Sequence, residues 1–451
     1  MKQIFSIIIS VVFTVSCRGE VMTLQECIQT CIDNNLALSN SRIGIAKART
    51  EVKRNRSRLL PEINGLFQFT GYLKSPVNVT TGTLLGNDFP DDPTWQTIKS
   101  MPYNVSAGVQ INMPLFNKSI LAATEVAKTV EELSLLSLEK AEEELTMQVC
   151  KVYYLAQASL QQERLTKENI SRMEDLCRIT EAMYQGGVIM ETDLNRVRIS
   201  LKNLNTLQNQ TSTLHSQQIN MLKYLLDLSP ESELEVASME EDFEPLQVDC
   251  VSETLPELAI LSGQKKLSEQ QISAVKAGYL PTVALTGFVG GLDYQNKFDH
   301  FFHTKAATDN WFGNCYLALS VKVPLYDGNA KKLKITQYGY EAQQAINKIE
   351  MTQKLLLENF DNAKLQLRQN MDIYSTQLEN RTQAENVLNV TMDQYKEGVT
   401  SMSVLLQDEM RLREAQSACV TALCQCNLAQ LELLRLSGDL RQLSRQTINM
   451  Q

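Results

Sequence analysis

Four short segments of the chain alternate apolar and polar residues with a period of two. In 103–113 the odd positions are Tyr, Val, Ala, Val, Ile and Met, and the even positions are Asn, Ser, Gly, Gln and Asn. The segment 314–323 does the same from Cys315 onward, 63–73 alternates more loosely, and 283–293 is the weakest of the four. This period predicts β-strands with one apolar face. Each is about as long as the roughly 9–11 residues that a tilted strand needs to cross a bilayer, so the pattern predicts transmembrane strands.

Much longer segments have the apolar spacing of three and four that is typical of helices. Residues 120–183 contain neither proline nor glycine, and residues 330–395 contain one glycine, Gly339. Shorter helical patterns follow at 193–228 and 403–436. The chain is therefore predicted to be mainly α with a transmembrane β part.

A Tyr-x-x-Gly motif separates each long helix from the one after it. The motifs end at Gly187 and Gly398. Glycine is the usual residue just beyond a helix C-terminus, because it adopts the left-handed conformation at little cost. We expect antiparallel helical hairpins with tips at about 184–190 and 395–402.

The motifs recur in one order, which indicates a tandem repeat. Leu-Pro precedes the first strand of each copy, and Pro-Leu-Phe or Pro-Leu-Tyr follows the second. Each copy is predicted to contain helix, strand, strand, helix and helix. The predicted layout is a first repeat at 20–229, an acidic linker at 230–257, a second repeat at 258–440 and a tail at 441–451. The linker has ten acidic residues and no basic one, and we expect it to be solvated.

Four strands from one chain cannot close a membrane barrel, because natural barrels begin at about eight strands. An open sheet would leave unpaired edge amides in lipid. If the strands span a membrane, two or three chains must therefore share one barrel of eight or twelve strands. The alternative is a soluble coiled-coil hairpin with ordinary strands.

The N-terminus predicts export. Lys2 precedes an apolar run from Ile4 to Val15, which has the length of a signal-peptide core. We expect a signal peptide at 1–19, with cleavage after Gly19. A lipoprotein signal that ends at an acylated Cys17 is the alternative, although threonine occupies the first position of its motif.

Composition argues against several other functions. The net charge of −9 and the lack of basic runs disfavour nucleic acid as a partner. The sequence has three histidines and no zinc-protease motif, phosphate-binding loop or serine elbow, so we expect no enzymatic activity and no cofactor. The close pairs Cys27 with Cys31 and Cys424 with Cys426 could hold a soft metal, but small apolar packing residues are the preferred interpretation and no metal site is predicted.

Together, the repeated unit, the Leu-Pro and Pro-Leu-aromatic motifs and the Tyr-x-x-Gly reversals resemble the TolC-like outer-membrane efflux proteins. The resemblance covers about residues 23–440. It implies a homotrimer whose 12-stranded outer-membrane β-barrel is continuous with a long periplasmic α-helical barrel. It also implies a passive exit duct for a tripartite efflux or type I secretion system, with outer-membrane lipid, a periplasmic adaptor protein and an inner-membrane transporter as partners. A structural periplasmic coiled-coil protein without transport activity remains the alternative.

The resemblance also implies a gate and a docking surface at the helical tips. Asp193 and Tyr395 match residues that hydrogen-bond across the closed gate in the family. The family often has arginine where this chain has Thr400 and aspartate where it has Val404, and Asp408 lies one position from the second acidic site. The gate is thus expected at Asp193, Tyr395, Thr400 and Asp408. The residues expected to contact the adaptor are Gly187, Val188, Gly398 and Val399.

Overall fold

The computed structural model describes residues 21–81, 95–246, 250–252, 254–298 and 311–440. It is mainly helical and divides into two compact units. The first unit comprises the described residues of Met1–Ile45, Ser134–Ser262 and Ile346–Gln451, and the second comprises those of Ala46–Leu133 and Gly263–Ala345. The longest helices contribute residues to both units.

The first unit is built from two helical hairpins. Their helices are α3 (Lys118–Gln185), α4 (Glu191–Leu225), α6 (Ala330–Lys396) and α7 (Met402–Ser437). Four clusters of buried apolar side chains hold this unit together, and one of them, near the tips, combines residues of all four helices. Burial of this kind is the main stabilising contribution in a helical protein of this type.

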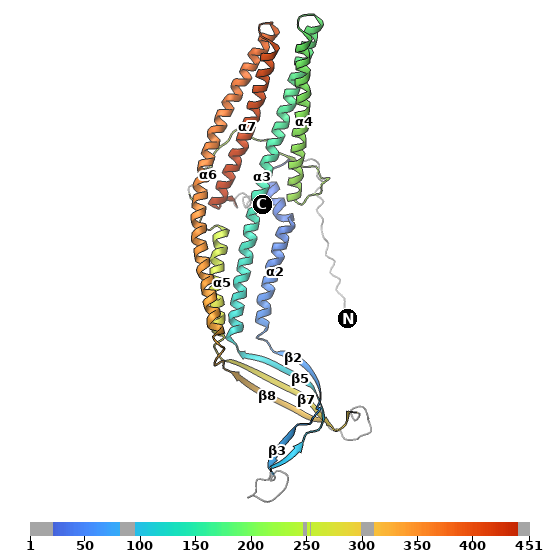
Figure 1. Cartoon of the computed structure of the whole chain (residues 1–451), viewed down its shortest axis with the longest axis vertical. Coiled ribbons are helices and arrows are strands. Elements are labelled where there is room, and N and C mark those ends of the chain that lie inside the picture. The colour runs from blue at the N-terminus through green and yellow to red at the C-terminus, as the bar shows by residue number, and fades with distance from the viewer. Residues whose placement is uncertain (1–20, 82–94, 247–249, 253, 299–310, 441–451) are drawn as a thin grey trace, which may run out of the picture. The chain divides into compact units, whose positions relative to one another are not determined.

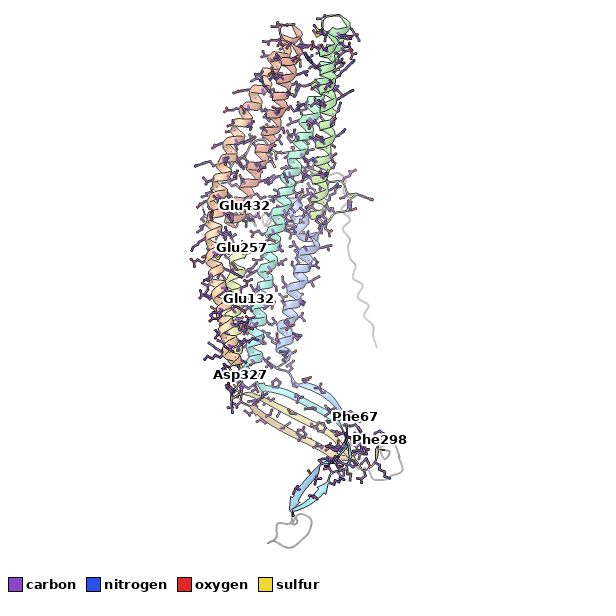
Figure 2. All side chains as sticks on the ribbon, in the orientation of Figure 1. Phe67, Glu132, Glu257, Phe298, Asp327 and Glu432 are labelled. Carbon is purple, nitrogen blue, oxygen red and sulfur yellow. The ribbon has the colours of Figure 1, made fainter. Side chains whose placement is uncertain are left out.

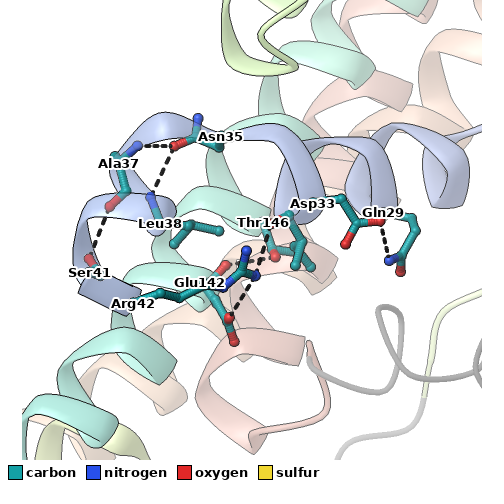
Figure 3. Close-up of polar contacts among 10 residues, drawn as sticks. Gln29, Asp33, Asn35, Ala37, Leu38, Ser41, Arg42, Glu142 and Thr146 are labelled. Carbon is teal, nitrogen blue, oxygen red and sulfur yellow. Dashed lines mark hydrogen bonds and ion pairs between the residues drawn. The ribbon is translucent and has the colours of Figure 1, made fainter. Parts of the chain in front are cut away.

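The first helix of the chain is broken at Asn35, which separates α1 (Leu24–Asn34) from α2 (Leu36–Ser57). The backbone of Asn35 is extended, and its side-chain oxygen accepts hydrogen bonds from the backbone amides of Ala37 at 2.9 Å and Leu38 at 3.4 Å (Figure 3). Asparagine is a favoured residue for capping a helix in this way. The chain therefore ends one helix and begins the next within a single residue.

The acidic segment at 230–257 makes specific contacts with the first unit. Its strand β6 (Glu235–Val236) pairs in parallel with β1 (Val21–Met22). Glu241 accepts two hydrogen bonds from Arg381, at 2.9 and 3.0 Å, and these hold the pKa of its carboxyl below the ordinary value. The phenol of Tyr374 donates to the backbone oxygen of Glu241 at 2.5 Å. The segment is thus a strap that packs on the helices as well as a solvated acidic run.

The second unit contains a four-stranded antiparallel sheet in the order β2-β5-β7-β8 (Figure 1). Its strands are β2 (Glu62–Gly71), β5 (Tyr103–Phe116), β7 (Thr282–Gln295) and β8 (Trp311–Lys322). They lie at the four segments of alternating pattern. A hairpin of β3 (Val77–Thr81) and β4 (Trp95–Lys99) extends from this sheet. Helix α5 (Pro256–Ala277) leads into β7.

Some of the sequence predictions concern residues outside the described part of the chain. These are the signal peptide at 1–19 with the alternative lipidation at Cys17, and the tail at 441–451. They stay predictions.

Candidate functional sites

One face of the sheet is apolar across all four strands. Val109 of β5 lies opposite Val289 of β7, because the register aligns the apolar positions of neighbouring strands. Phe67 on β2 (Figure 2) is 73% exposed and Leu317 on β8 is 76% exposed. Other exposed residues on this face are Ile63, Phe69, Ile111, Leu319 and Val321. A continuous exposed apolar surface of this kind marks contact with a membrane or with another protein.

The opposite face of the sheet is more polar. Asn112 accepts a hydrogen bond from the side chain of Gln110 at 3.3 Å and another from Thr286 at 3.2 Å. The buried ring of Phe288 covers the paired glycines Gly108 and Gly290, and a Cβ atom on either glycine would lie within 2.8 Å of that ring. The two faces therefore differ as the lipid and lumen faces of a membrane strand differ.

Aromatic side chains gather at both ends of the sheet. At the end near the hairpin, Phe69 stacks on Tyr103 with ring centroids 6.1 Å apart, and Tyr294 contacts Phe312 at 6.3 Å. At the end near the helices, the exposed Tyr326 follows β8. Membrane barrels place aromatic residues at both interfaces in this way.

The two outer strands of the sheet, β2 and β8, have no strand partner on their outer edges within the described residues. Such edges offer unpaired backbone groups to another chain. None of the helices that the structure describes carries an apolar stretch long enough to cross a bilayer.

The two helical reversals have the same backbone geometry. Gly187 and Gly398 adopt φ angles of +70° and +73°. The amide of Val188 donates to the carbonyl of Met183 at 2.9 Å, and the equivalent bond from Val399 to Gln394 is 2.8 Å long. These are Schellman motifs, which require a left-handed residue at the glycine position.

Both tips present an exposed valine. Val188 is 70% exposed and Val399 is 71% exposed, directly after the two glycines. In a Schellman motif the residue at this position often packs back on its own helix. Here it remains in solvent, so both tips offer a small apolar surface to a partner.

The structure brings the predicted gate residues Asp193 and Tyr395 near one another but does not join them by a hydrogen bond. Asp193 forms an ion pair with Arg196 at 3.2 Å, and Arg196 donates to the hydroxyl of Ser403 at 2.9 Å. The ring of Tyr395 is buried in the tip cluster, and its hydroxyl oxygen has no hydrogen-bond partner among the described residues. Burial raises the pKa of Tyr395, the neighbouring side chain of Thr180 opposes that shift, and the charge of Asp193 adds to it.

The other two predicted gate residues lie elsewhere. Thr400 is partly exposed in the reversal itself. Asp408 is buried, where its carboxylate accepts hydrogen bonds from Thr391 at 2.8 Å and from Arg411 at 3.1 Å. Within one chain, Asp408 therefore ties α7 to α6 and does not project into solvent.

A set of buried polar contacts between α3 and α7 is not predicted by the sequence pattern. Asn169 donates to Gln416 at 3.1 Å, and Arg172 forms an ion pair with Glu409 at 3.6 Å. Burial raises the pKa of Glu409, although Arg172 and Arg413 oppose the shift. Polar residues inside a helical pattern carry no local signal of a distant partner, so only the structure identifies these contacts between the two hairpins.

The cysteines of the two close pairs lie in the apolar clusters. Burial raises the pKa of the Cys27 and Cys31 thiols to about 12, and that of Cys424 and Cys426 to about 11. The thiol of Cys31 donates to the carbonyl of Leu225 at 3.0 Å. These groups are protonated at neutral pH and fill space in the core, as the preferred interpretation expected.

Solved structures share this fold. CusC, from a study of folding and transmembrane channel formation, matches with a TM-score of 0.72 at 14% identity, over 91% of each chain. The open state of the MtrE outer membrane channel of Neisseria gonorrhoeae matches with a TM-score of 0.71 at 18% identity, over 92% of this chain and 88% of that one. The chain therefore shares the fold of these two channel proteins.

The sequence leads to a more specific assignment. The outer membrane efflux protein family matches residues 27–226 and 255–439, and the chain therefore belongs to this family, which places it in the outer membrane. The toluene efflux pump outer membrane protein TtgC of Pseudomonas putida is 23% identical over 276 residues, which are 60% of this chain and 54% of that protein. The chain spans about half the length of the curated relatives it matches. The predicted resemblance to TolC-like proteins is confirmed.

Proposed function

We propose that the protein is the outer-membrane exit duct of a tripartite efflux or type I secretion system. The observation that carries this proposal is the sheet with one continuous apolar face and two open edge strands, β2 and β8. An open edge is not tolerated in lipid, so the sheet must be completed by other copies. Three copies would supply twelve strands and close a barrel.

The helical hairpins then form the periplasmic part of the duct. Their apolar clusters lie within one chain, but α6 also exposes Leu333, Tyr340 and Met351. These side chains supply a surface on which a neighbouring copy would pack, giving a helical barrel. The duct performs no chemistry, and cargo moves with energy supplied by an inner-membrane transporter.

The tips carry the gate and the docking surface. The exposed valines Val188 and Val399 offer a periplasmic adaptor protein an apolar contact at each reversal. Asp193 and Tyr395 form the latch of the closed state when neighbouring hairpins come together, and the unpartnered hydroxyl of Tyr395 is the group available for that bond. Bulky substitutions at Val188 or Thr400 should abolish efflux and leave the trimer intact.

Membrane fractionation and planar-bilayer recording test the proposal. We expect the full chain to enter the outer membrane as a trimer that resists heating in detergent, and to form channels in a planar bilayer. A monomer in the periplasm that forms no channel would overturn the duct and favour the structural coiled-coil protein.

A further inference from the structure

The second unit concentrates positive charge where its helices meet the sheet. Here α2 leads into β2, β5 into α3, α5 into β7, and β8 into α6. The register places Glu62 opposite Asn112 and Thr282 opposite Lys322, so all four junctions lie along one end of the sheet (Figure 1). We call the basic residues at these junctions the basic collar. They are Lys53, Arg54, Arg56, Arg58, Lys118, Lys276, Lys331, Lys332 and Lys334.

The collar is unusual in a chain with a net charge of −9. The stretches that contain it, 52–62, 116–124, 270–282 and 323–334, hold only two acidic residues, Glu62 and Asp327. Asp327 (Figure 2) is already paired with Lys331 at 3.0 Å, and Glu51, just outside these stretches, is paired with Arg54. Most of the collar charge is therefore not neutralised by acidic residues of the same stretches.

Favourable interaction with helix dipoles explains the position of only about half of the basic residues in the collar. Cations at the C-terminal ends of α2 and α5 are favourable, because the helix dipole is negative there. Lys118, however, lies at the N-terminal end of α3, where a cation is unfavourable and where the first turn has no acidic residue. Lys331 has a similar position on α6, but Asp327 already pairs with it. The charge of Lys118, placed against the dipole, therefore indicates an external anionic partner.

A cavity of about 760 Å³ opens within the collar, between α2, α3 and α5. Leu59, Leu60 and Leu121 give it apolar walls, and Arg56 and Lys118 are cations of its lining. Glu125 and Lys128 also line it and pair with one another at 2.7 Å. Arg56 and Lys118 are exposed, and neither has an acidic partner in the part of the chain that the structure describes. A site with apolar walls and two free cations fits an amphiphile with an anionic head group.

We propose that this cavity binds an anionic phospholipid from the membrane leaflet on the helical side of the sheet. Arg56 and Lys118 hold the phosphate, and the leucines contact the upper part of an acyl chain. The remaining collar residues attract the same leaflet less specifically. This inference rests on the proposed function, since it requires the sheet to span a membrane.

The test uses the detergent-solubilised full chain reconstituted into phosphatidylcholine vesicles with and without phosphatidylglycerol. Mass spectrometry then counts the lipid that stays bound after mild delipidation. We expect wild type to retain phosphatidylglycerol in preference to phosphatidylcholine. The double variant Arg56→Gln/Lys118→Gln should retain about 30-fold less, because each surface cation contributes about a factor of five to the binding of anionic lipid.

Two further variants separate the cavity from general charge attraction. The matched control Arg164→Gln/Lys202→Gln removes two exposed cations from α3 and α4 in the first unit and should retain phosphatidylglycerol like wild type. The variant Ala122→Phe fills the cavity, keeps every charge, and should lose retention. Unchanged retention in both the double variant and Ala122→Phe would overturn the site.

Inorganic phosphate identifies the source of the anion. If phosphate at matched ionic strength displaces no phosphatidylglycerol, the lipid is the ligand. If phosphate binds the detergent-solubilised chain and phosphatidylglycerol is not retained, the cavity is a simple anion site and the lipid proposal is wrong. Failure of the chain to float with either kind of vesicle would instead overturn the proposed duct itself.

Discussion

The two units of the chain differ in how far their apolar side chains are buried. Within the described residues, the four clusters of buried apolar side chains lie in the first unit, where helices α3, α4, α6 and α7 pack against one another. In the second unit, large apolar side chains such as Phe67 and Leu317 are exposed. The first unit therefore covers most of its apolar side chains within one chain, whereas under the proposed function the second unit would be covered by lipid and further copies.

Truncation of a buried leucine in the first unit tests this contrast with the largest expected change in the free energy of unfolding. Leu405 is fully buried in the tip cluster. Leu405→Ala should reduce the free energy of unfolding by about 2–5 kcal/mol, because it removes apolar contacts and leaves a cavity. Leu317→Ala, on the exposed face of β8, should change it by less than about 0.5 kcal/mol. Denaturant unfolding of both variants in detergent measures the difference, and equal losses would contradict the contrast.

Charge placed on the two faces of one strand tests the second unit. Leu319 lies on the apolar face of β8 and its neighbour Ser320 on the other. Leu319→Arg should weaken membrane insertion by about 2–4 kcal/mol if the residue lies near mid-membrane. Ser320→Arg should insert almost normally, because its side chain would point into the aqueous lumen. The yield of inserted, heat-resistant trimer is the measurement, and similar yields for both variants would contradict the assignment of the faces.

A buried acid gives the first unit a pH dependence. Glu409 has a pKa raised above the ordinary value of 4.5, mainly by burial. The folded protein thus binds this proton more tightly than the unfolded chain does, and the resulting stabilisation is present below pH 4.5 and is lost as pH rises through the raised pKa. Arg172 and Arg413 oppose the shift, so we expect an effect of about 1 kcal/mol or less.

The isosteric variant Glu409→Gln should remove this contribution. As pH rises from 4 to about 7, the free energy of unfolding of the wild type should fall relative to that of Glu409→Gln. Thr421→Ala, at an exposed and non-titrating position on the same helix, should keep the wild-type profile. Thermal unfolding across this pH range is the measurement, and a constant difference between wild type and Glu409→Gln would show that the pKa of Glu409 is not raised.

Local patterns predicted the features that local residues determine. The alternation along 103–113 and along the other three alternating segments predicted the strands of the sheet. Gly187 and Gly398 predicted the reversals. Each of these signals lies within a few residues of the feature it predicts. The contact of Arg381 with Glu241, 140 residues away, has no such signal. The pairing of Arg172 with Glu409 likewise depends on how two hairpins pack. Closure of the proposed barrel would depend on other copies, so it can be derived neither from the period of the sequence nor from the structure of a single chain.

The smallest expected effect on stability compares the two tyrosines of the repeated motif. Tyr184 is 39% exposed, whereas Tyr395, at the same position of the second motif, is 5% exposed and has a hydroxyl without a partner in the described residues. Tyr395→Phe should change the free energy of unfolding by less than about 0.5 kcal/mol, because no hydrogen bond within the chain is lost.

If Tyr395 and Asp193 form the latch between hairpins, Tyr395→Phe and Asp193→Ala should each raise single-channel conductance in planar bilayers. The double variant should add little, because both changes remove the same bond. Tyr184→Phe is the matched control and should conduct like wild type. Unchanged conductance in both Tyr395→Phe and Asp193→Ala would contradict the latch. Tyr395 would then be a core residue, and Asp193 would be the partner of Arg196 alone.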